Sequence, residues 1–340
     1  MPDGGYELLC LGGAALLTAV FTPLSIRLAP VIGAMDVPLD DRRMHTHAMP
    51  RCGGLALFLS FVLLIPLCGD GASGGVHLLW GATILFLVGV CDDVFRLPAT
   101  LKLLVQLLAV GVALPGVLPP TGAGGFFPAL RGAAAVIWVL ALTNAHNMMD
   151  GLDGLAAGIS TAEAGMLGLS LLLCGEVSYA RAALLLCGCC LGYLPFNRHP
   201  ARVFLGDTGS LFLGYALGML SLRLPVSLRA PTGILPPLLL FAVPLSDLCF
   251  AVIRRVSRGQ SPFAADRGHW HHRLIDAGLG QRQVCFWLIL PATLLGTAAL
   301  LLMGDVWNGF AAAVAVLATA GSLAVLSART AGARRVTLRG

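Results

Sequence analysis

The stretch that decides the architecture runs from Thr143 to Ser160 and reads Thr-Asn-Ala-His-Asn-Met-Met-Asp-Gly-Leu-Asp-Gly-Leu-Ala-Ala-Gly-Ile-Ser. Two amides (Asn144, Asn147) and two carboxylates (Asp150, Asp153) recur in it every three residues. Long apolar runs precede and follow it. Uncompensated polar groups are costly at a membrane, so they usually line a site or a water-filled cavity. We therefore expect a functional site at the ends of two membrane helices.

The composition excludes a soluble globular protein. Of 340 residues, 57% are hydrophobic and 11% are charged, whereas a soluble domain carries about 25% charged residues. We predict an all-α polytopic membrane protein that forms a single integral-membrane domain over residues 1–340. The net charge of +5 is spread over short loops, which argues against a nucleic-acid partner.

A spanning helix needs about 20 apolar residues. On that measure we predict about 11 membrane helices (10–11). They are 6–28, 53–70, 76–91, 99–118, 131–148, 156–175, 180–196, 208–224, 232–254, 284–303 and 306–327. Most basic residues then fall on one side, which places the N-terminus outside and the C-terminus, with a basic tail at 328–340, in the cytoplasm.

The polar clusters all fall on the predicted cytoplasmic side, in five loops. These are 36–54, 91–100, 144–155, 196–208 and 255–283. We therefore predict one active site on the cytoplasmic face. A transporter with these carboxylates as ion sites would instead place charges near mid-membrane in paired halves. A catalytically inactive scaffold would be expected to lack one of the key carboxylates.

Two of the clusters offer carboxylate and amide oxygens. Asp92 and Asp93 end an apolar run, an arrangement that suits a proton acceptor or a hard cation, or else a helix cap before a solvated loop. The amides and carboxylates of the 143–160 stretch converge whether that stretch stays helical or unwinds at its glycines. Such oxygen ligands are what Mg²⁺ requires.

The later clusters offer groups for anions. Asp207-Thr-Gly-Ser opens a predicted helix, where free N–H groups favour phosphate and where Asp207 could simply cap the helix. His269, His271, His272, Arg267 and Arg273 could bind zinc or phosphate, or could belong to a solvated basic loop; we favour a folded loop that presents donors to a pyrophosphate. In the first loop, His45 and Arg51 could meet substrate or merely link helices. For Asp247 we favour a structural pairing with a neighbouring helix.

Taken together, the motifs resemble those of the polyprenyl-phosphate N-acetylhexosamine-1-phosphate transferases. The matching motifs are Asp-x-Pro, Arg-Arg-x-His and Pro-Arg-x-Gly-Gly within 36–54, then Asp92-Asp93, 144–158, 196–210 and 266–274. They follow the family order and cover the chain from about residue 30 to 285. The pattern His-x-His-His-Arg-Leu, preceded by Ser261-Pro-Phe, looks like the WecA/TagO branch.

The resemblance implies a Mg²⁺-dependent transfer, with Mn²⁺ as a substitute metal. N-acetylhexosamine 1-phosphate, most simply GlcNAc 1-phosphate, would pass from a UDP-sugar to undecaprenyl phosphate with release of UMP. UDP-GalNAc, a UDP-deoxy-amino sugar and UDP-MurNAc-pentapeptide are alternative donors. The expected setting is the bacterial inner (plasma) membrane, with membrane lipid and a second copy of the chain as further partners.

The resemblance also implies roles for particular residues. Asp207 and Asn147 would bind Mg²⁺, and Asp92 would be the base, supported by Asp93 and Asp150. Asp153, Asn197 and Phe204 would surround the uridine. His269, His271, His272 and Arg273 would contact the diphosphate or sugar. Asn144, His45, Arg51 and Arg267 complete the expected set of substrate contacts. A direct displacement is preferred, and a covalent phospho-aspartate intermediate stays open.

Overall fold

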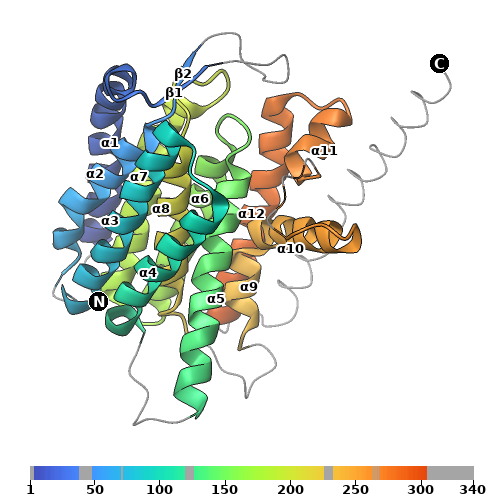
Figure 1. Cartoon of the computed structure of the whole chain (residues 1–340). Coiled ribbons are helices and arrows are strands. Elements are labelled where there is room, and N and C mark those ends of the chain that lie inside the picture. Colours follow the sequence, from blue (N-terminus) through green and yellow to red (C-terminus); the bar gives the residue numbers. More distant parts are fainter. Residues whose placement is uncertain are drawn as a thin grey trace.

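The computed structural model describes residues 4–37, 48–69, 72–118, 126–225, 233–262, 264, 266 and 268–304. Within these ranges the chain is a bundle of helices with one short two-stranded sheet (Figure 1). The predicted span 306–327, the basic tail, His45 and Arg267 lie outside the described residues.

The helices follow the predicted order. They are α1 Gly4–Ile32, α2 Gly53–Leu64, the 3-10 helix η1 Ile65–Cys68, α3 Ala72–Phe95, α4 Ala99–Val117, α5 Phe126–Met149, α6 Leu155–Leu173, α7 Val177–Asn197, α8 Gly206–Ser221, α9 Leu235–Leu240, α10 Ala242–Ser257, α11 Trp270–Asp276 and α12 Gln281–Met303. In the part of the chain that the structure describes, seven helices are long and apolar enough to cross a membrane: α1, α3, α4, α5, α6, α7 and α12. The chain is thus a multi-pass membrane protein, while the count of 11 and the orientation remain predictions.

Helix α8 is the centre of the bundle. All of its residues are buried, and it packs against α2, α3 and α5. The close approach depends on glycine, because a Cβ on Gly54 would lie 2.1 Å from the backbone nitrogen of Gly209, and one on Gly89 would lie 2.5 Å from the Cα of Thr208. The first turn of α8 therefore packs closely against α2 and α3, at the ends of these helices that we predict to face the cytoplasm.

The predicted single helix 232–254 is wrong. The structure has two helices there, α9 ending at Leu240 and α10 beginning at Ala242. The physical reason is Pro244, which has no N–H to donate to the carbonyl of Leu240 and whose ring would collide with that carbonyl in a continuous helix. After the break, α10 runs across the direction of α5 and α12 (Figure 1).

A short hairpin closes the first polar loop. Strands β1 (Met35–Asp36) and β2 (Met49–Pro50) pair antiparallel, a feature that the sequence did not indicate. Beyond β2 the chain runs beside the segment before α8, where Phe204 donates its N–H to Pro50 and accepts one from Gly53. Arg51 lies between these bonds, so its position is set by the backbone on both sides.

Candidate active site

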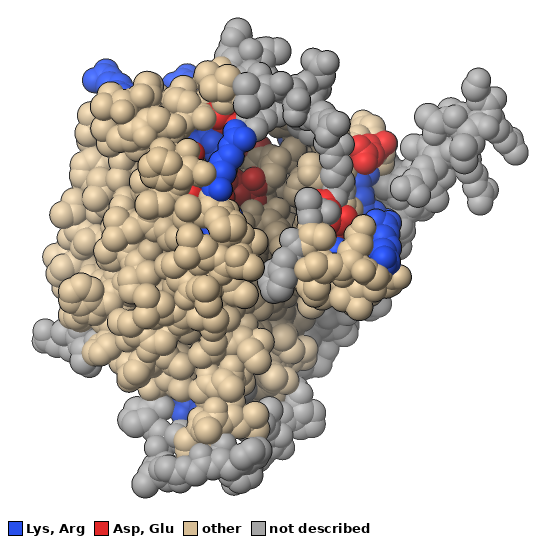
Figure 2. Space-filling view, in the orientation of Figure 1, with Lys and Arg blue, Asp and Glu red and all other residues tan. Residues whose placement is uncertain are grey.

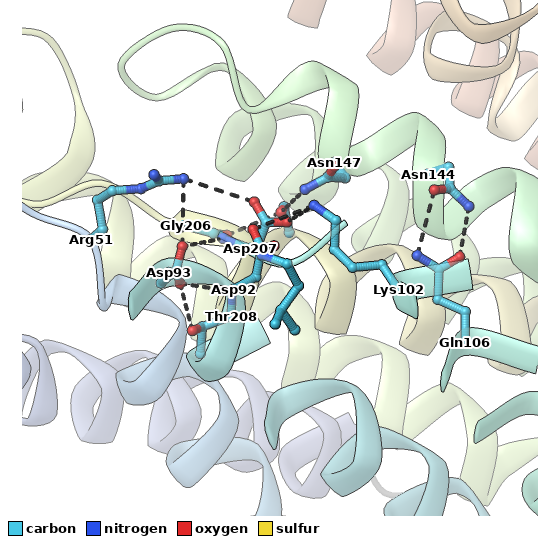
Figure 3. A network of polar contacts seen from close by, with 12 residues as sticks. Arg51, Asp92, Asp93, Lys102, Gln106, Asn144, Asn147, Gly206, Asp207 and Thr208 are labelled. Atoms are coloured by element: carbon cyan, nitrogen blue, oxygen red, sulfur yellow. Dashed lines mark hydrogen bonds and ion pairs between the residues drawn. The ribbon is translucent and has the colours of Figure 1, made fainter. Parts of the chain in front are cut away.

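Asp93 anchors the first turn of α8 (Figure 3). Its carboxylate accepts hydrogen bonds from the N–H groups of Asp207 (2.9 Å) and Thr208 (3.0 Å) and from the hydroxyl of Thr208 (2.6 Å). Gly206 makes the turn into the helix at φ +72°, and a Cβ there would lie 2.4 Å from the carbonyl oxygen of Arg51. Asp93 is 5% exposed, so its role in this arrangement is to position Asp207.

Lys102 bridges two of the predicted carboxylates. Its Nζ lies 2.8 Å from Oδ2 of Asp207 and 3.3 Å from Oδ2 of Asp92. Arg51 approaches from the other side, 3.8 Å from Oδ1 of Asp207 and 3.5 Å from Oδ1 of Asp93. The sequence reasoning missed Lys102, although a signal was present: it is the only lysine among 22 basic residues.

The two carboxylate oxygens of Asp92 have different partners. Its Oδ1 accepts the N–H of Leu97 (2.8 Å), which holds the turn between α3 and α4, and its Oδ2 lies toward Lys102. Asp92 therefore pairs with Lys102, whereas Asp93 lies 3.5 Å from Arg51 and accepts the first N–H groups of α8. The predicted difference in role between the two carboxylates has a geometric basis here.

The 143–160 stretch is helical to Met149 and then turns, so its four polar groups do not share one helix face. Asn147 donates from Nδ2 to the hydroxyl of Ser210 (3.0 Å), which ties α5 to α8. Asn144 exchanges hydrogen bonds with Gln106 of α4, at 2.8 and 3.4 Å, a partner that the sequence reasoning missed (Figure 3). Asn144 is therefore paired with Gln106 through the two side-chain amides, and this pair lies beside the carboxylate cluster.

Asp150 follows α5 directly and is half-buried. Removal from water is the main reason that its pKa rises to about 7. The guanidinium of Arg51 opposes this rise, and the carboxylates of Asp207 and Asp93 add to it. Asp150 thus belongs electrostatically to the same cluster, as predicted from its motif.

Asp153 and Asn197 hold two loops together. Oδ2 of Asp153 lies 2.8 Å from Nδ1 of His199 and accepts the N–H of Ala201 (3.1 Å). Asn197 is 3% exposed; it accepts the N–H of Gly154 (3.1 Å) and donates to the carbonyl of Val203 (2.9 Å). Both side chains join the loop after α5 to the loop before α8, which is the segment where Phe204 pairs with Pro50 and Gly53.

The histidine cluster at 269–272 packs against the loop that follows α5. Asp247 on α10 lies 2.7 Å from Nδ1 of His269 and accepts the N–H of Trp270 (2.8 Å), so it pairs with the start of α11 and also contacts a predicted site histidine. His271 packs against Gly151, where a Cβ would lie 2.2 Å from its Nε2. Burial first, and then the neighbouring His272, lower the pKa of His271 to about 3. His271 is therefore neutral near pH 7.

The predicted cationic contact Arg273 is less central. Its side chain is exposed, and its guanidinium carbon lies 5.5 Å from the ring centroid of Trp270. His272 is half-buried, with its ring 4.3 Å from that of His271. These two residues lie at the border of the histidine cluster.

The site is a hollow with acidic side chains inside it. Figure 2 shows these beside Lys and Arg side chains at one end of the bundle, while the flank below is nearly free of charge. The described residues hold no group of three or more His, Cys, Asp or Glu side chains spaced to enclose a metal. Mg²⁺ commonly takes one or two carboxylates together with substrate phosphates. Asp207 could supply one such carboxylate, and Asn147, bound to Ser210 on the same helix as Asp207, could supply an amide oxygen.

The comparison with protein families agrees with this geometry. The family described as Glycosyl transferase family 4 matches residues 76–225, which run from α3 to the end of α8 and contain Asp92, Asp93, Asp150, Asp153 and Asp207. The region that holds the candidate site is thus similar to a family of glycosyl transferases.

Individual relatives cover more of the chain. A Bacillus subtilis protein named probable undecaprenyl-phosphate N-acetylglucosaminyl 1-phosphate transferase is 35% identical over 297 residues, 85% of this chain and 83% of the relative. The decaprenyl-phosphate N-acetylglucosaminephosphotransferase of Mycobacterium tuberculosis H37Rv is 34% identical, over 82% and 78%. The undecaprenyl-phosphate alpha-N-acetylglucosaminyl 1-phosphate transferase of Escherichia coli K12 is 27% identical, over 84% and 81%. The chain belongs to glycosyl transferase family 4.

Proposed function

We propose that this protein transfers N-acetylglucosamine 1-phosphate from UDP-N-acetylglucosamine to a polyprenyl phosphate, with Mg²⁺ as cofactor. The observation that carries the proposal is the Lys102 bridge between Asp92 and Asp207 at one end of a membrane bundle. In this bridge the cation Lys102 and the proposed proton acceptor Asp92 lie beside Asp207, the proposed metal ligand. The names of the relatives support the donor and the acceptor class.

The reaction joins two anions. An oxygen of the lipid phosphate attacks the phosphorus that carries the sugar, the bond from that phosphorus to the bridging oxygen of UMP breaks, and the electron pair leaves with UMP. Repulsion between the phosphates is the main barrier, so cations and positioning supply most of the catalysis. Lys102 and Arg51 are the described cations closest to the cluster.

The carboxylates divide the remaining work. Asp92 accepts the proton of the lipid phosphate when this arrives as the monoanion, which is the minor form near pH 7 because a phosphate monoester has a second pKa of about 6. Asp207 with Asn147 would hold Mg²⁺, which when bound neutralises charge on the diphosphate. Asp93 keeps Asp207 in place through the first turn of α8. A single displacement needs no further group.

The chemistry of the lipid acceptor explains why this enzyme would be a membrane protein. The acceptor has a charged head and a long hydrocarbon chain, so its phosphate stays at the interface while the chain remains in lipid. The polar cluster at the end of apolar helices matches that partition, and we place the protein in the plasma membrane of a bacterium. The sugar identity rests on the relatives' names, because no described contact selects one N-acetylhexosamine over another.

The test measures UMP release by the purified protein in detergent with undecaprenyl phosphate and a panel of UDP-sugars. UMP from UDP-GlcNAc alone, lost with EDTA and restored by Mg²⁺, is the expected result. Asp92→Asn should lose activity at least about tenfold, whereas Asp276→Asn, which alters an exposed carboxylate at the end of α11, should keep full activity. UMP release with a different UDP-sugar would change the proposed donor and leave the proposed reaction as it is. No UMP from any donor with folded protein would contradict the proposal and favour a transport role.

A further inference from the structure

Both oxygens of the Asp207 carboxylate face a cation from the protein itself. Nζ of Lys102 lies 2.8 Å from Oδ2, and a guanidinium nitrogen of Arg51 lies 3.8 Å from Oδ1. The three side chains are mostly shielded from water, with exposed fractions of 21% for Lys102, 26% for Arg51 and 12% for Asp207. Charges in such a place interact strongly because little solvent screens them.

This arrangement bears on how a divalent cation would bind. Mg²⁺ sits about 2.1 Å from a ligand oxygen, so on Oδ2 it would stand within about 5 Å of the Lys102 ammonium. Like charges that close repel, and the lysine also uses part of the negative charge that attracts the metal. Lys102 and the metal are therefore competitors for the same carboxylate.

The lysine has another partner once the donor binds. A diphosphate brings negative oxygens into the cluster, and an ammonium on a flexible four-carbon stem can turn from a carboxylate to a phosphate. Arg51 is less suited to this exchange because its guanidinium is planar and spans Asp93 as well as Asp207, at 3.5 and 3.8 Å. The only lysine of the chain stands at the position where such an exchange would matter.

We propose that Lys102 is an internal competitor that keeps the metal affinity of Asp207 low until the diphosphate of the donor draws the ammonium away. Metal and donor then bind cooperatively, and the coupling between them runs through Lys102. Thermodynamic reciprocity requires that the donor raise metal affinity by the same factor as the metal raises donor affinity. The inference rests on the proposed function, since it takes Asp207 as the metal ligand.

The experiment measures Mn²⁺ binding to the purified protein in detergent, by electron paramagnetic resonance of free Mn²⁺, with and without UDP-GlcNAc. In the wild type, the donor should raise Mn²⁺ affinity about tenfold or more. K102M should bind Mn²⁺ about tenfold more tightly than the wild type without the donor, and the donor should add little. K102R keeps the charge, so it should bind Mn²⁺ without the donor about as weakly as the wild type, and the donor should raise that affinity less than in the wild type.

Further variants test whether the effect on Mn²⁺ affinity depends on the distance of the cation from Asp207. R51M should tighten donor-free Mn²⁺ binding less than K102M does, because Arg51 lies farther from Asp207. R258M removes an exposed arginine at the end of α10 and should match the wild type. K102Q, which is neutral but still donates hydrogen bonds, replaces K102M if that variant does not fold, as judged by size-exclusion chromatography and thermal melting.

The outcomes separate the inference from the function. Donor-free Mn²⁺ affinity in folded K102M or K102Q that equals or falls below the wild-type value, with the donor effect intact, would overturn the role of Lys102 alone. No Mn²⁺ binding by the wild type even with UDP-GlcNAc would remove the metal from the proposed function, and the inference with it. Tighter donor-free binding with lost coupling supports both.

Discussion

Asp93 and Thr208 are joined by two hydrogen bonds to one oxygen, since Oδ2 of Asp93 accepts both the N–H (3.0 Å) and the hydroxyl (2.6 Å) of Thr208. The preceding residue, Asp92, instead shares Lys102 with Asp207. Two adjacent carboxylates thus serve different purposes, because successive side chains on a helix end point to different neighbours. The difference is open to experiment.

Asp93→Asn should destabilise the protein more than Asp92→Asn does. Hydrogen bonds to a charged group contribute about 1.5–3 kcal/mol each, and the amide cannot accept all three bonds that Asp93 accepts. Asp92→Asn keeps an acceptor for Leu97 and should lose activity at least about tenfold with a smaller change in Tm. Thermal melting and UMP release measure the two effects. An Asp93→Asn variant with wild-type Tm would contradict the anchoring role.

Asp207→Asn should nearly abolish turnover and weaken the dependence on Mg²⁺. The substitution removes the charge that the proposed metal needs and leaves Lys102 with Asp92 alone. Rates measured across a Mg²⁺ titration test this directly. If the variant kept full activity at low Mg²⁺, Asp207 would no longer be a candidate metal ligand.

Gly151→Ala should lower the Tm of the protein through His271. The added Cβ would lie 2.2 Å from Nε2 of His271, so either α11 or the loop after α5 must move. The double variant Gly151→Ala/His271→Ser also removes the imidazole, which leaves space for the added Cβ. It should therefore recover part of the Tm that Gly151→Ala loses. Thermal melting of the wild type, both single variants and the double variant measures the coupling. Additive losses would show that the two residues are independent.

Acid should destabilise the protein in part through His271. A lowered pKa means that its contribution to stability is full above the unfolded value of 6.5 and is lost as the pH falls from there toward about 3. Between pH 7 and pH 5 this amounts to about 2 kcal/mol, at about 1.4 kcal/mol per pH unit.

Melting temperatures at pH 7 and pH 5 test this expectation. His271→Gln should show a smaller fall in Tm than the wild type, because glutamine does not titrate. An equal fall in His271→Gln and in the wild type would mean that folding does not lower the pKa of this imidazole.

Much of the fold and the site could be predicted because hydropathy and motif order are local properties. The helices α1, α4, α6 and α12 lie close to their predicted ranges, and Asp92, Asp150 and Asp207 do meet in one cluster. The break before α10 was missed, although Pro244 carried the signal for it. The β1–β2 hairpin was missed because strands of two residues leave no periodic pattern.

The sequence by itself determined that the chain is a helical membrane protein and which residue types carry its chemistry, since burial in lipid demands apolar runs and an anionic reaction demands acids, amides and cations. Only the tertiary structure decided which of these groups touch. Lys102 reaches Asp207 across 105 positions of the chain, and Gln106 pairs with Asn144 on another helix. Those contacts depend on how α3, α4 and α5 pack around α8, and helix packing is set by the shapes of many side chains together rather than by any one motif.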